Sequence, residues 1–272
     1  MSDTVDSSEY LLGHDEREWD RLYEQHLLWR EGLLGALLRA GLTRGSSALE
    51  VGCGSGALLR DLAAIVGEDG RAVGIEQDLA AHEKARKMTA MMPGAEVRLG
   101  DLTTAHLGGP WDVIVARWVF SFLPEPAAAV ARLAGALKPG GALVIQDYDH
   151  DGVRVFPDPD GAIHRVIEGF RAAYRARGGD LWVGPKLPGM MRTEGLTVAP
   201  LAPEVKAGSP ESLPWRWVER FLFEHIDTLI ADGHLSEAER RAFEAAWAAA
   251  KDNPAAVLVT PIQIIVTAVN SR

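Results

Sequence analysis

The sequence predicts an α/β fold built on a doubly wound parallel sheet. Between Leu49 and about Gln146, short apolar segments rich in Val, Ile and Leu alternate with longer amphipathic segments. Strands that are apolar on both faces are typical of a parallel sheet covered by helices on both sides. The alternation of strand and helix indicates βαβ units, from which such a sheet is assembled.

The elements of this region follow one another in a regular order. The predicted strands cover residues 47–51, 72–76, 95–100, 111–117 and 141–148, and the predicted helices between them cover 57–66, 79–91 and 125–137. Before the fifth strand, "LKPGG" (137–141) predicts a tight turn, because proline fixes φ and two glycines let the chain turn sharply. The segment before Leu49 is predicted to be a helix with Gly41 as its C-terminal cap.

After Tyr148 the alternation stops. "DHDGVRVFPDPDG" predicts a loop, residues 162–179 predict a helix, and a strand is expected near 195–201. "ESLPWRWVERFLFEHIDTLIADG" and "LSEAERRAFEAAWAAAK" predict a pair of helices, and Ser236 and Glu239 form a capping box for the second. The apolar segment "VTPIQIIVTAVN" predicts a last strand.

The composition argues against several classes of protein. The 272 residues include 28 Lys and Arg against 38 Asp and Glu, so the formal net charge of −10 disfavours nucleic acid and anionic membranes as partners. The single cysteine, Cys53, excludes an internal disulfide and a zinc site made of several cysteines. The acidic start "MSDTVDSSEY" and the absence of a run of about 18 apolar residues predict a cytoplasmic protein without a secretory signal or a spanning helix.

The segment "EVGCGSG" (50–56) predicts a ligand site between a strand and a helix. We expect Gly52 to turn the chain, Gly54 to let the backbone touch a ligand, and Gly56 to let the helix pack closely on the strand. The amide groups at the start of the helix favour an anionic group there, either a phosphate or a carboxylate. A glycine-rich turn without a ligand is the alternative for this motif alone.

Two acidic residues extend this prediction to an adenosine-containing ligand. Glu76 ends the next apolar strand, 20 residues after Gly56 (76 − 56), where a carboxylate can accept hydrogen bonds from both ribose hydroxyls. Asp101, in "RLGDL", follows the third strand and can accept a hydrogen bond from an adenine amine. Three separate positions therefore indicate one kind of ligand.

Taken together, "ALEVGCGSG", "GIEQD", "LGDL", "WDVIVARWVFSFLPEP" and "LKPGGALVIQD" resemble the class I S-adenosylmethionine-dependent methyltransferases. The resemblance covers roughly residues 45–148 and is nearest the small-molecule branch, which includes quinone C-methyltransferases and natural-product tailoring enzymes. It implies a Rossmann-like sheet of seven mostly parallel strands with an antiparallel last strand. "IQIIVTAVN" fits that last strand and "GLTVAPLAP" fits the strand before it.

On this resemblance we expect a single methyltransferase domain over residues 1–272. The cofactor is expected to be S-adenosyl-L-methionine, with S-adenosyl-L-homocysteine as the product. The expected parts are an N-terminal helical cap (1–45), a cofactor-binding core (46–148), the acceptor-side helices with the sixth strand and a helical lid insertion (149–254), and the last strand (255–272).

The resemblance also implies which residues hold the cofactor. Tyr10 or Gln25, from the amino-terminal segment, is expected to reach across it. Phe122 departs from the family pattern, because many relatives carry a histidine there; we expect it to form an apolar wall. The implied cofactor residues are Glu50, Gly52, Gly54 and Gly56 at the methionine end, Glu76 at the ribose, Gln77, Asp101 and Leu102 at the adenine, and Ala116 and Arg117 beneath the sulfonium.

The acceptor is expected at the carboxyl ends of the fourth and fifth strands, where open α/β sheets bind ligands. His150, flanked by Asp149 and Asp151, is the first candidate for a catalytic base and Tyr148 is the second. A solvated acidic loop without a function is the alternative. Asp147, Asp149 and Asp151 could also hold Mg²⁺ through oxygen ligands, but we expect no metal.

The helix predicted from "PWRWVERFLFEHIDTLI" has two apolar stripes. We expect one stripe to pack on the sheet and the other to roof the acceptor pocket, with a homodimer interface as the alternative. The first stripe comprises Trp215, Val218, Leu222, Ile226 and Leu229, and the second comprises Trp217, Phe221 and Phe223. The predicted acceptor contacts are Trp118, Phe122, Asp149, Trp217 and Phe221.

The sequence therefore predicts a methyltransferase that acts on O, N or C of a small, apolar or aromatic metabolite. Two other functions fit part of the pattern. A nicotinamide-dependent oxidoreductase shares the glycine loop and the acid, but the alternate glycines, Asp101 and the antiparallel last strand argue against it. A protein that binds the cofactor without transferring a methyl group would use the same binding residues.

Overall fold

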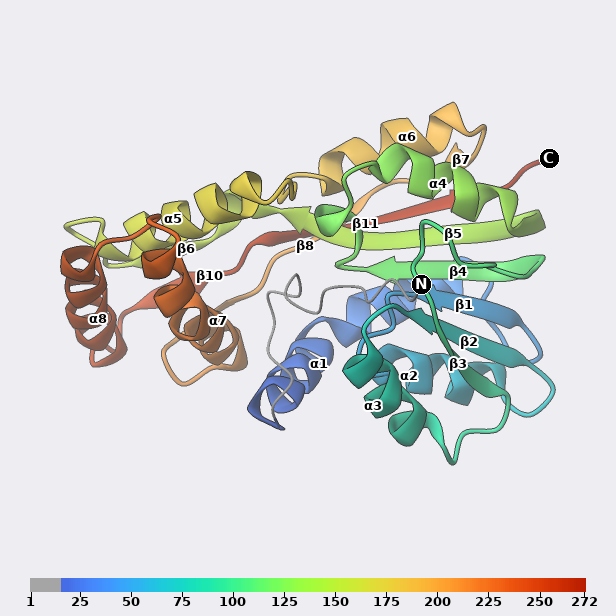
Figure 1. Ribbon diagram of the computed structural model, residues 1–272, viewed down its shortest axis with the longest axis horizontal. Helices are drawn as coiled ribbons and strands as arrows, with labels where there is room; N and C mark the ends of the chain where they lie inside the picture. The colour runs from blue at the N-terminus through green and yellow to red at the C-terminus, as the bar shows by residue number, and fades with distance from the viewer. Residues whose placement is uncertain (1–15) are drawn as a thin grey trace, which may run out of the picture.

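The computed structural model describes residues 16–272 and is organised around one large mixed sheet (Figure 1). The hydrogen-bonded path is β3-β2-β1-β4-β5-β11-β7, and β8 also pairs with β11. Neighbouring strands from β3 to β5 are parallel, whereas β11 is antiparallel to β5. The strands are β1 (Ser47–Val51), β2 (Arg71–Glu76), β3 (Ala95–Leu99), β4 (Trp111–Arg117), β5 (Leu137–Asp149), β7 (Thr197–Val198), β8 (Ala202–Glu204) and β11 (Ile262–Val269).

This topology confirms the predicted Rossmann-like sheet with an antiparallel strand near its edge. The path has the seven expected strands, and β8 is an additional eighth. Because the carboxyl ends of β1, β2, β4 and β5 meet at one edge, the loops that follow these strands are brought together there.

Helices cover both faces of the sheet (Figure 1). On one face, α1 (Glu16–Arg39) and α2 (Ala57–Val66) pack on alternate strand residues such as Ala48, Val115 and Val144. α3 (Leu79–Thr89) lies beside α2. On the other face, α4 (Pro126–Gly135) and α6 (Leu187–Thr193) bury the intervening strand residues, among them Leu49 and Ile145. Within residues 16–272, no helix combines the length and apolarity needed to cross a bilayer.

A second, smaller group of elements extends beyond the carboxyl end of the long strand β5 (Figure 1). It contains a three-stranded sheet in the order β6-β10-β9 and three helices that share one apolar cluster. We call this group the helical lobe. Its elements are β6 (Arg154–Phe156), α5 (Ala162–Ala176), β9 (Ala207–Gly208), α7 (Leu213–Ala231), α8 (Glu237–Lys251) and β10 (Val257–Val259).

Two segments of the helical lobe differ from the structure predicted for them. The segment expected as one last strand is divided, because β10 pairs with β6 and β9 whereas β11 pairs with β5. The segment expected as a loop after Tyr148 contains a 3₁₀ turn (His150–Gly152) and β6. These strands have only two or three residues, too few to give a recognisable alternation.

The turn predicted at "LKPGG" is in fact part of β5. Leu137 already pairs with Trp111, and the next pairing joins Ala142 to Val113. Residues 138–141 therefore bulge out of the ladder opposite a single residue of β4. Gly140 allows this bulge with a φ of 76° and donates its amide to the carbonyl of Asn270 at 2.7 Å.

The predicted helix ends are confirmed where a specific cap is present. α1 ends just before Gly41, which has a φ of 95° in the left-handed region. α8 begins with a complete capping box, in which the hydroxyl of Ser236 accepts from the amide of Glu239 and the carboxylate of Glu239 accepts from the amide of Ser236.

Candidate functional site

The glycine loop joins β1 to α2 with all three alternate glycines in the left-handed region. The φ values of Gly52, Gly54 and Gly56 are 64°, 52° and 83°. A side chain at Gly56 would place its Cβ 2.9 Å from the Cα of Ala85, so this glycine allows α2 and α3 to approach, not the helix and strand as predicted. At Gly54 nothing lies within 4 Å of such a Cβ, which leaves its backbone open to a ligand.

Glu76 connects the end of β2 to this loop. Its Oε2 accepts from the amide of Gly54 at 2.7 Å, and its Oε1 accepts from the amide of Asp78 at 3.0 Å. Burial raises the pKa of the Glu76 carboxyl, and the backbone hydrogen bonds oppose this rise. The structure thus places the predicted ribose-binding carboxylate against the glycine loop, while Gln77 beside it is exposed.

The other two residues predicted at the adenine, Asp101 and Leu102, differ in their exposure. Asp101 is exposed, and its Oδ1 accepts from the amide of Thr103 at 2.7 Å and from its hydroxyl at 2.9 Å. Leu102 is buried in the apolar cluster on the α4 face of the sheet. The polar contact from Asp101 and the backbone contact from Leu102 stay predictions.

Glu50 and Arg117 lie on adjacent strands, on the face of the sheet covered by α1, and their side chains interact electrostatically. Glu50 lies on β1 and is 3% exposed, and Arg117 ends the adjacent strand β4. Burial raises the pKa of Glu50 to about 8, against the opposing effect of Arg117, and burial lowers the pKa of Arg117. Within residues 16–272, neither Oε2 of Glu50 nor Nη1 of Arg117 has a hydrogen-bond partner.

The other side of the Arg117 guanidinium is held by α1 and α2. Its Nη2 lies 3.2 Å from Nδ1 of His26, whose Nε2 lies 3.1 Å from Oδ2 of Asp61. Because a guanidinium can only donate, Nδ1 of His26 accepts and its Nε2 carries the proton towards Asp61. Burial lowers the pKa of His26, so the imidazole is neutral in this chain of contacts.

Asp61 completes this network by pairing with a second arginine. Its carboxylate accepts from Nε and Nη2 of Arg30 at 2.6 and 2.9 Å. Burial alone would raise the pKa of Asp61, but the hydrogen bonds from His26 and Arg30 hold it well below its usual range. The sequence offered one unused signal for this network, an acid within the otherwise apolar face of "ALLRDLAAIV".

Trp118, directly after β4, is held in an unusual backbone conformation. Its φ of 55° lies in the left-handed region, which bulky side chains rarely adopt. Its Nε1 donates to Oε1 of Gln263 on β11 at 2.6 Å. The Arg117 guanidinium lies 4.7 Å from the centre of its ring, and the ring of Tyr148 stacks beside it at 6.2 Å. Ala116, just before this turn, is fully buried.

The structure argues against His150 as a catalytic base. Its Nδ1 accepts from Nε of Arg171 at 3.1 Å, and Arg171 also donates to the carbonyl of His150. Burial, together with the positive charge of Arg171, lowers the pKa of His150 to about 3, so the imidazole takes up a proton only weakly. The second candidate, Tyr148, has a hydroxyl whose pKa is raised by burial well above its usual value.

The three nearby aspartates do not converge on one point. Asp147 accepts from the amides of Phe120 and Ser121, and Asp149 accepts from the amide of Asp151. The carboxylate of Asp151 accepts from Nε1 of Trp182 at 2.7 Å. Among residues 16–272, no cluster of three His, Cys, Asp or Glu side chains has a metal-binding arrangement.

A row of aromatic rings leads from the end of β5 into the helical lobe. Tyr148 contacts His150, which contacts Phe170 on α5 at 5.9 Å between ring centres. Phe170 contacts Phe221 on α7 at 4.6 Å and borders a small cavity between α5 and α7. We call Trp118, Tyr148, His150, Phe170 and Phe221 the aromatic row. Phe122 lies beside it and is exposed, with its ring 5.3 Å from that of Tyr174.

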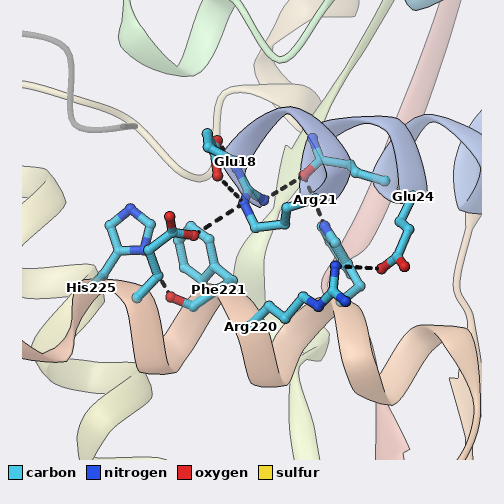
Figure 2. A network of polar contacts seen from close by, with 9 residues as sticks. Glu18, Arg21, Glu24, Arg220, Phe221 and His225 are labelled. Atoms are coloured by element: carbon cyan, nitrogen blue, oxygen red, sulfur yellow. Dashed lines mark hydrogen bonds and ion pairs between the residues drawn. The ribbon is translucent and has the colours of Figure 1, made fainter. Parts of the chain in front are cut away.

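α1 and α7 are joined by a polar seam, which Figure 2 shows from close by. Both Nε and Nη2 of Arg21 donate to the carboxylate of Glu18 at 2.6 Å, and Nε also lies 3.4 Å from Glu224 on α7. Oε1 of Gln25 accepts from Arg21 at 3.0 Å and from Nε1 of Trp217 at 2.8 Å. Gln25 is thus placed in this seam, whereas Tyr10 lies outside the described residues.

The two apolar stripes on α7 contact other elements than those predicted. The first stripe packs against α5 and α8 within the lobe, not on the large sheet. In the second stripe, Trp217 and Phe221 face α1, whereas Phe223 contacts Phe243 and Trp247 on α8. Because the first stripe and Trp217 are buried within this chain, a homodimer through them is not supported.

Comparisons with known proteins point to one domain type. Residues 49–143 match the family model described as a methyltransferase domain. The chain is 39% identical over 116 residues to an uncharacterized 37.1 kDa protein in transposon TN4556 of Streptomyces fradiae, covering 42% of this chain and 34% of that protein. It is 27% identical over 146 residues to the demethylmenaquinone methyltransferase of Staphylococcus aureus, covering 52% of this chain and 59% of that enzyme.

Solved structures share the fold at low sequence identity. The YcgJ protein of Bacillus subtilis aligns with a TM-score of 0.59 and 14% identity, over 89% of this chain and 99% of that one. A SAM-dependent methyltransferase of Aquifex aeolicus aligns with a TM-score of 0.54 and 20% identity, over 69% of this chain and 92% of that one. The chain spans between one third and three fifths of the length of the curated relatives it matches.

Proposed function

We propose that this chain, whose residues 49–143 match a methyltransferase domain, is a class I S-adenosylmethionine-dependent enzyme that transfers a methyl group to a small acceptor with an aromatic or apolar body. One observation carries the proposal. Towards the carboxyl ends of the adjacent strands β1 and β4, Glu50 and Arg117 each keep one buried polar atom without a partner among residues 16–272. Buried polar atoms of this kind normally have partners, so the pair marks a ligand position.

The two atoms complement the amino-acid end of S-adenosylmethionine. Oε2 of Glu50 can accept from the ammonium group, and Nη1 of Arg117 can donate to the carboxylate. A dinucleotide such as NAD has no ammonium and carboxylate on one carbon, so this pairing favours the sulfonium cofactor. Glu76 is expected to accept from the ribose hydroxyls, since its carboxylate lies against the glycine loop.

When bound, the cofactor supplies a methyl group that is already activated by its positively charged sulfur. The work of the protein is therefore to hold the cofactor and the acceptor in line and to exclude water. Correct alignment alone can be equivalent to an effective concentration on the order of 10⁵–10⁸ M. His26 and Asp61 contribute by holding the guanidinium of Arg117 in place from behind.

The aromatic row supports an acceptor with a planar ring. Trp118 and Tyr148 lie at the carboxyl ends of β4 and β5, next to Arg117, and Phe170 and Phe221 continue the row into the lobe. The relative from Staphylococcus aureus is named a demethylmenaquinone methyltransferase, which is in keeping with a quinone-like acceptor. Since His150 and Tyr148 are poorly suited to remove a proton, we favour a carbon or an acidic hydroxyl as the methylated atom.

Calorimetric titration tests the cofactor part of this proposal. We expect wild-type protein to bind S-adenosylmethionine and S-adenosylhomocysteine but not NAD, and Glu50→Gln to bind both sulfur nucleosides more than about tenfold more weakly. Glu96→Gln, an exposed carboxylate paired with Arg98, is the control and should bind normally. Binding of NAD alone, or normal binding by Glu50→Gln, would overturn the assignment.

Transfer of a labelled methyl group to a panel of hydroxylated aromatic compounds tests whether the protein is an enzyme and not only a cofactor-binding protein.

A further inference from the structure

Two glutamines next to the proposed cofactor site have amide atoms without partners. Gln146 lies on β5 and Gln263 on β11, and both side chains are fully buried. Within residues 16–272, neither the oxygen nor the nitrogen of the Gln146 amide has a hydrogen-bond partner, and the nitrogen of Gln263 has none either. Since burial without a partner is unfavourable for an amide, three such atoms in one place indicate a missing hydrogen-bonding group.

The register of the sheet brings these amides together. Gln146 pairs with Arg117 on β4 and with Ile265 on β11, and Tyr148, two residues further on, pairs with Gln263. Because side chains alternate between the two faces, Arg117, Gln146, Tyr148 and Gln263 all lie on the face covered by α1. The two amides therefore lie between Arg117, a proposed cofactor-binding residue, and the first rings of the aromatic row.

The hydrogen bond from Trp118 determines which atom of the Gln263 amide can still bind another group. The indole Nε1 can only donate, so the atom of Gln263 that it contacts at 2.6 Å is the amide oxygen. The amide nitrogen of Gln263 is then left as a donor, and Gln146 offers both a donor and an acceptor. The left-handed backbone of Trp118 is an uncommon, strained conformation for a bulky residue, and such conformations are concentrated at functional sites.

We infer that Gln146 and Gln263 are specificity-determining residues, whose amides bind a hydroxyl or carbonyl oxygen of the acceptor while its ring packs on the aromatic row. An oxygen at this position accepts from the amide nitrogens of both glutamines. If it belongs to a hydroxyl, it also donates to the amide oxygen of Gln146. The inference rests on the proposed methyltransferase function and names the part of the acceptor that the site recognises.

Two compounds that differ in one hydroxyl provide the test. 1-Naphthol and naphthalene are titrated by equilibrium dialysis into protein saturated with S-adenosylhomocysteine. We expect wild-type protein to prefer 1-naphthol by about tenfold or more, and Gln146→Met to lose this preference. Gln263→Met should weaken 1-naphthol binding in the same direction. Ile265→Val, which changes the apolar residue paired with Gln146, is the control and should keep the preference.

The variants also separate recognition from a structural role. Methionine has nearly the shape of glutamine without the unpartnered amide, so Gln146→Met should bind S-adenosylhomocysteine normally and melt at a temperature no lower than that of the wild type. Equal affinity of wild-type protein for the two probes, binding of neither, or a preserved preference in Gln146→Met would overturn the inference. Failure of wild-type protein to bind S-adenosylhomocysteine would instead overturn the proposed function on which it rests.

Discussion

The carboxylate of Glu76 accepts a hydrogen bond of 2.7 Å from the amide of Gly54. This bond joins the end of β2 to the glycine loop after β1, so two motifs separated by 22 residues act as one unit. The loop is thereby held in the left-handed geometry that leaves the backbone of Gly54 open. The same carboxylate is the predicted partner of the ribose.

Glu76→Ala should weaken binding of S-adenosylhomocysteine by more than about tenfold, because it removes a charged acceptor and releases the loop. Calorimetric titration measures the effect, with Glu96→Ala on the exposed part of the neighbouring strand β3 as the control. Unchanged affinity in Glu76→Ala would mean that the ribose is bound elsewhere.

Glu50 should make the stability of the cofactor-free protein depend on pH. Burial raises its pKa from 4.5 to about 8, so the folded state holds this proton more tightly than the unfolded state. The carboxyl therefore contributes stability below about pH 4.5, and this contribution is lost as the pH rises through about 8. Glu50→Gln cannot lose a proton, so we expect its melting temperature to exceed that of the wild type at about pH 9.

Scanning calorimetry at about pH 5 and pH 9 measures this difference, which should be larger at the higher pH. Ionised Glu50 is the form that can bind an ammonium group, so cofactor binding at neutral pH should release protons to the buffer. A parallel pH dependence of the two proteins would show that Glu50 is not the titrating group.

Asp147 should be important for stability and not for cofactor binding. Its buried carboxylate accepts from the amides of Phe120, Ser121 and Tyr148, and so fixes the turn after β4. Asp147→Ala leaves these donors without a partner and should lower the free energy of unfolding by about 2–4 kcal/mol. Urea denaturation measures the loss. Asp149→Ala, which removes one hydrogen bond of 3.4 Å, should cost less than about 1 kcal/mol.

Arg21 should hold α1 on α7. Its side chain is 4% exposed, and its removal leaves the buried carboxylate of Glu18 without this cation. Arg21→Met should therefore increase amide hydrogen exchange in the first half of α1 by about tenfold or more. Arg220→Met removes the more exposed pair with Glu24 on the same two helices, and its effect should stay within about twofold. Similar exchange in both variants would contradict a specific role for Arg21.

The sequence predicted the elements of the cofactor-binding region well, because their apolar periodicity is local. α2 and β4 have the predicted boundaries, and the antiparallel pairing of β11 is as expected. The small sheet of the helical lobe was not predicted, since it assembles segments of two or three residues from positions far apart in the chain. The bulge at "LKPGG" was interpreted as a turn because the same residues suit both structures.

The polar contacts of the site were harder to predict because they join residues that are far apart in the chain. His150 was selected for its acidic neighbours in sequence, but its partner in the structure is Arg171, 21 residues away on α5. The contacts from His26 to Arg117 and Asp61 bring together α1, α2 and β4. Only the tertiary structure reveals that Glu50, Arg117 and Gln146 each have a buried polar atom that lacks a partner among residues 16–272.

A crystal structure of the protein with S-adenosylhomocysteine is the most direct test of the central proposal. We expect the ammonium group on the carboxylate of Glu50, the carboxylate on the guanidinium of Arg117, and the ribose on Glu76. A nucleoside bound away from the glycine loop, or an amino-acid end that contacts neither Glu50 nor Arg117, would contradict it.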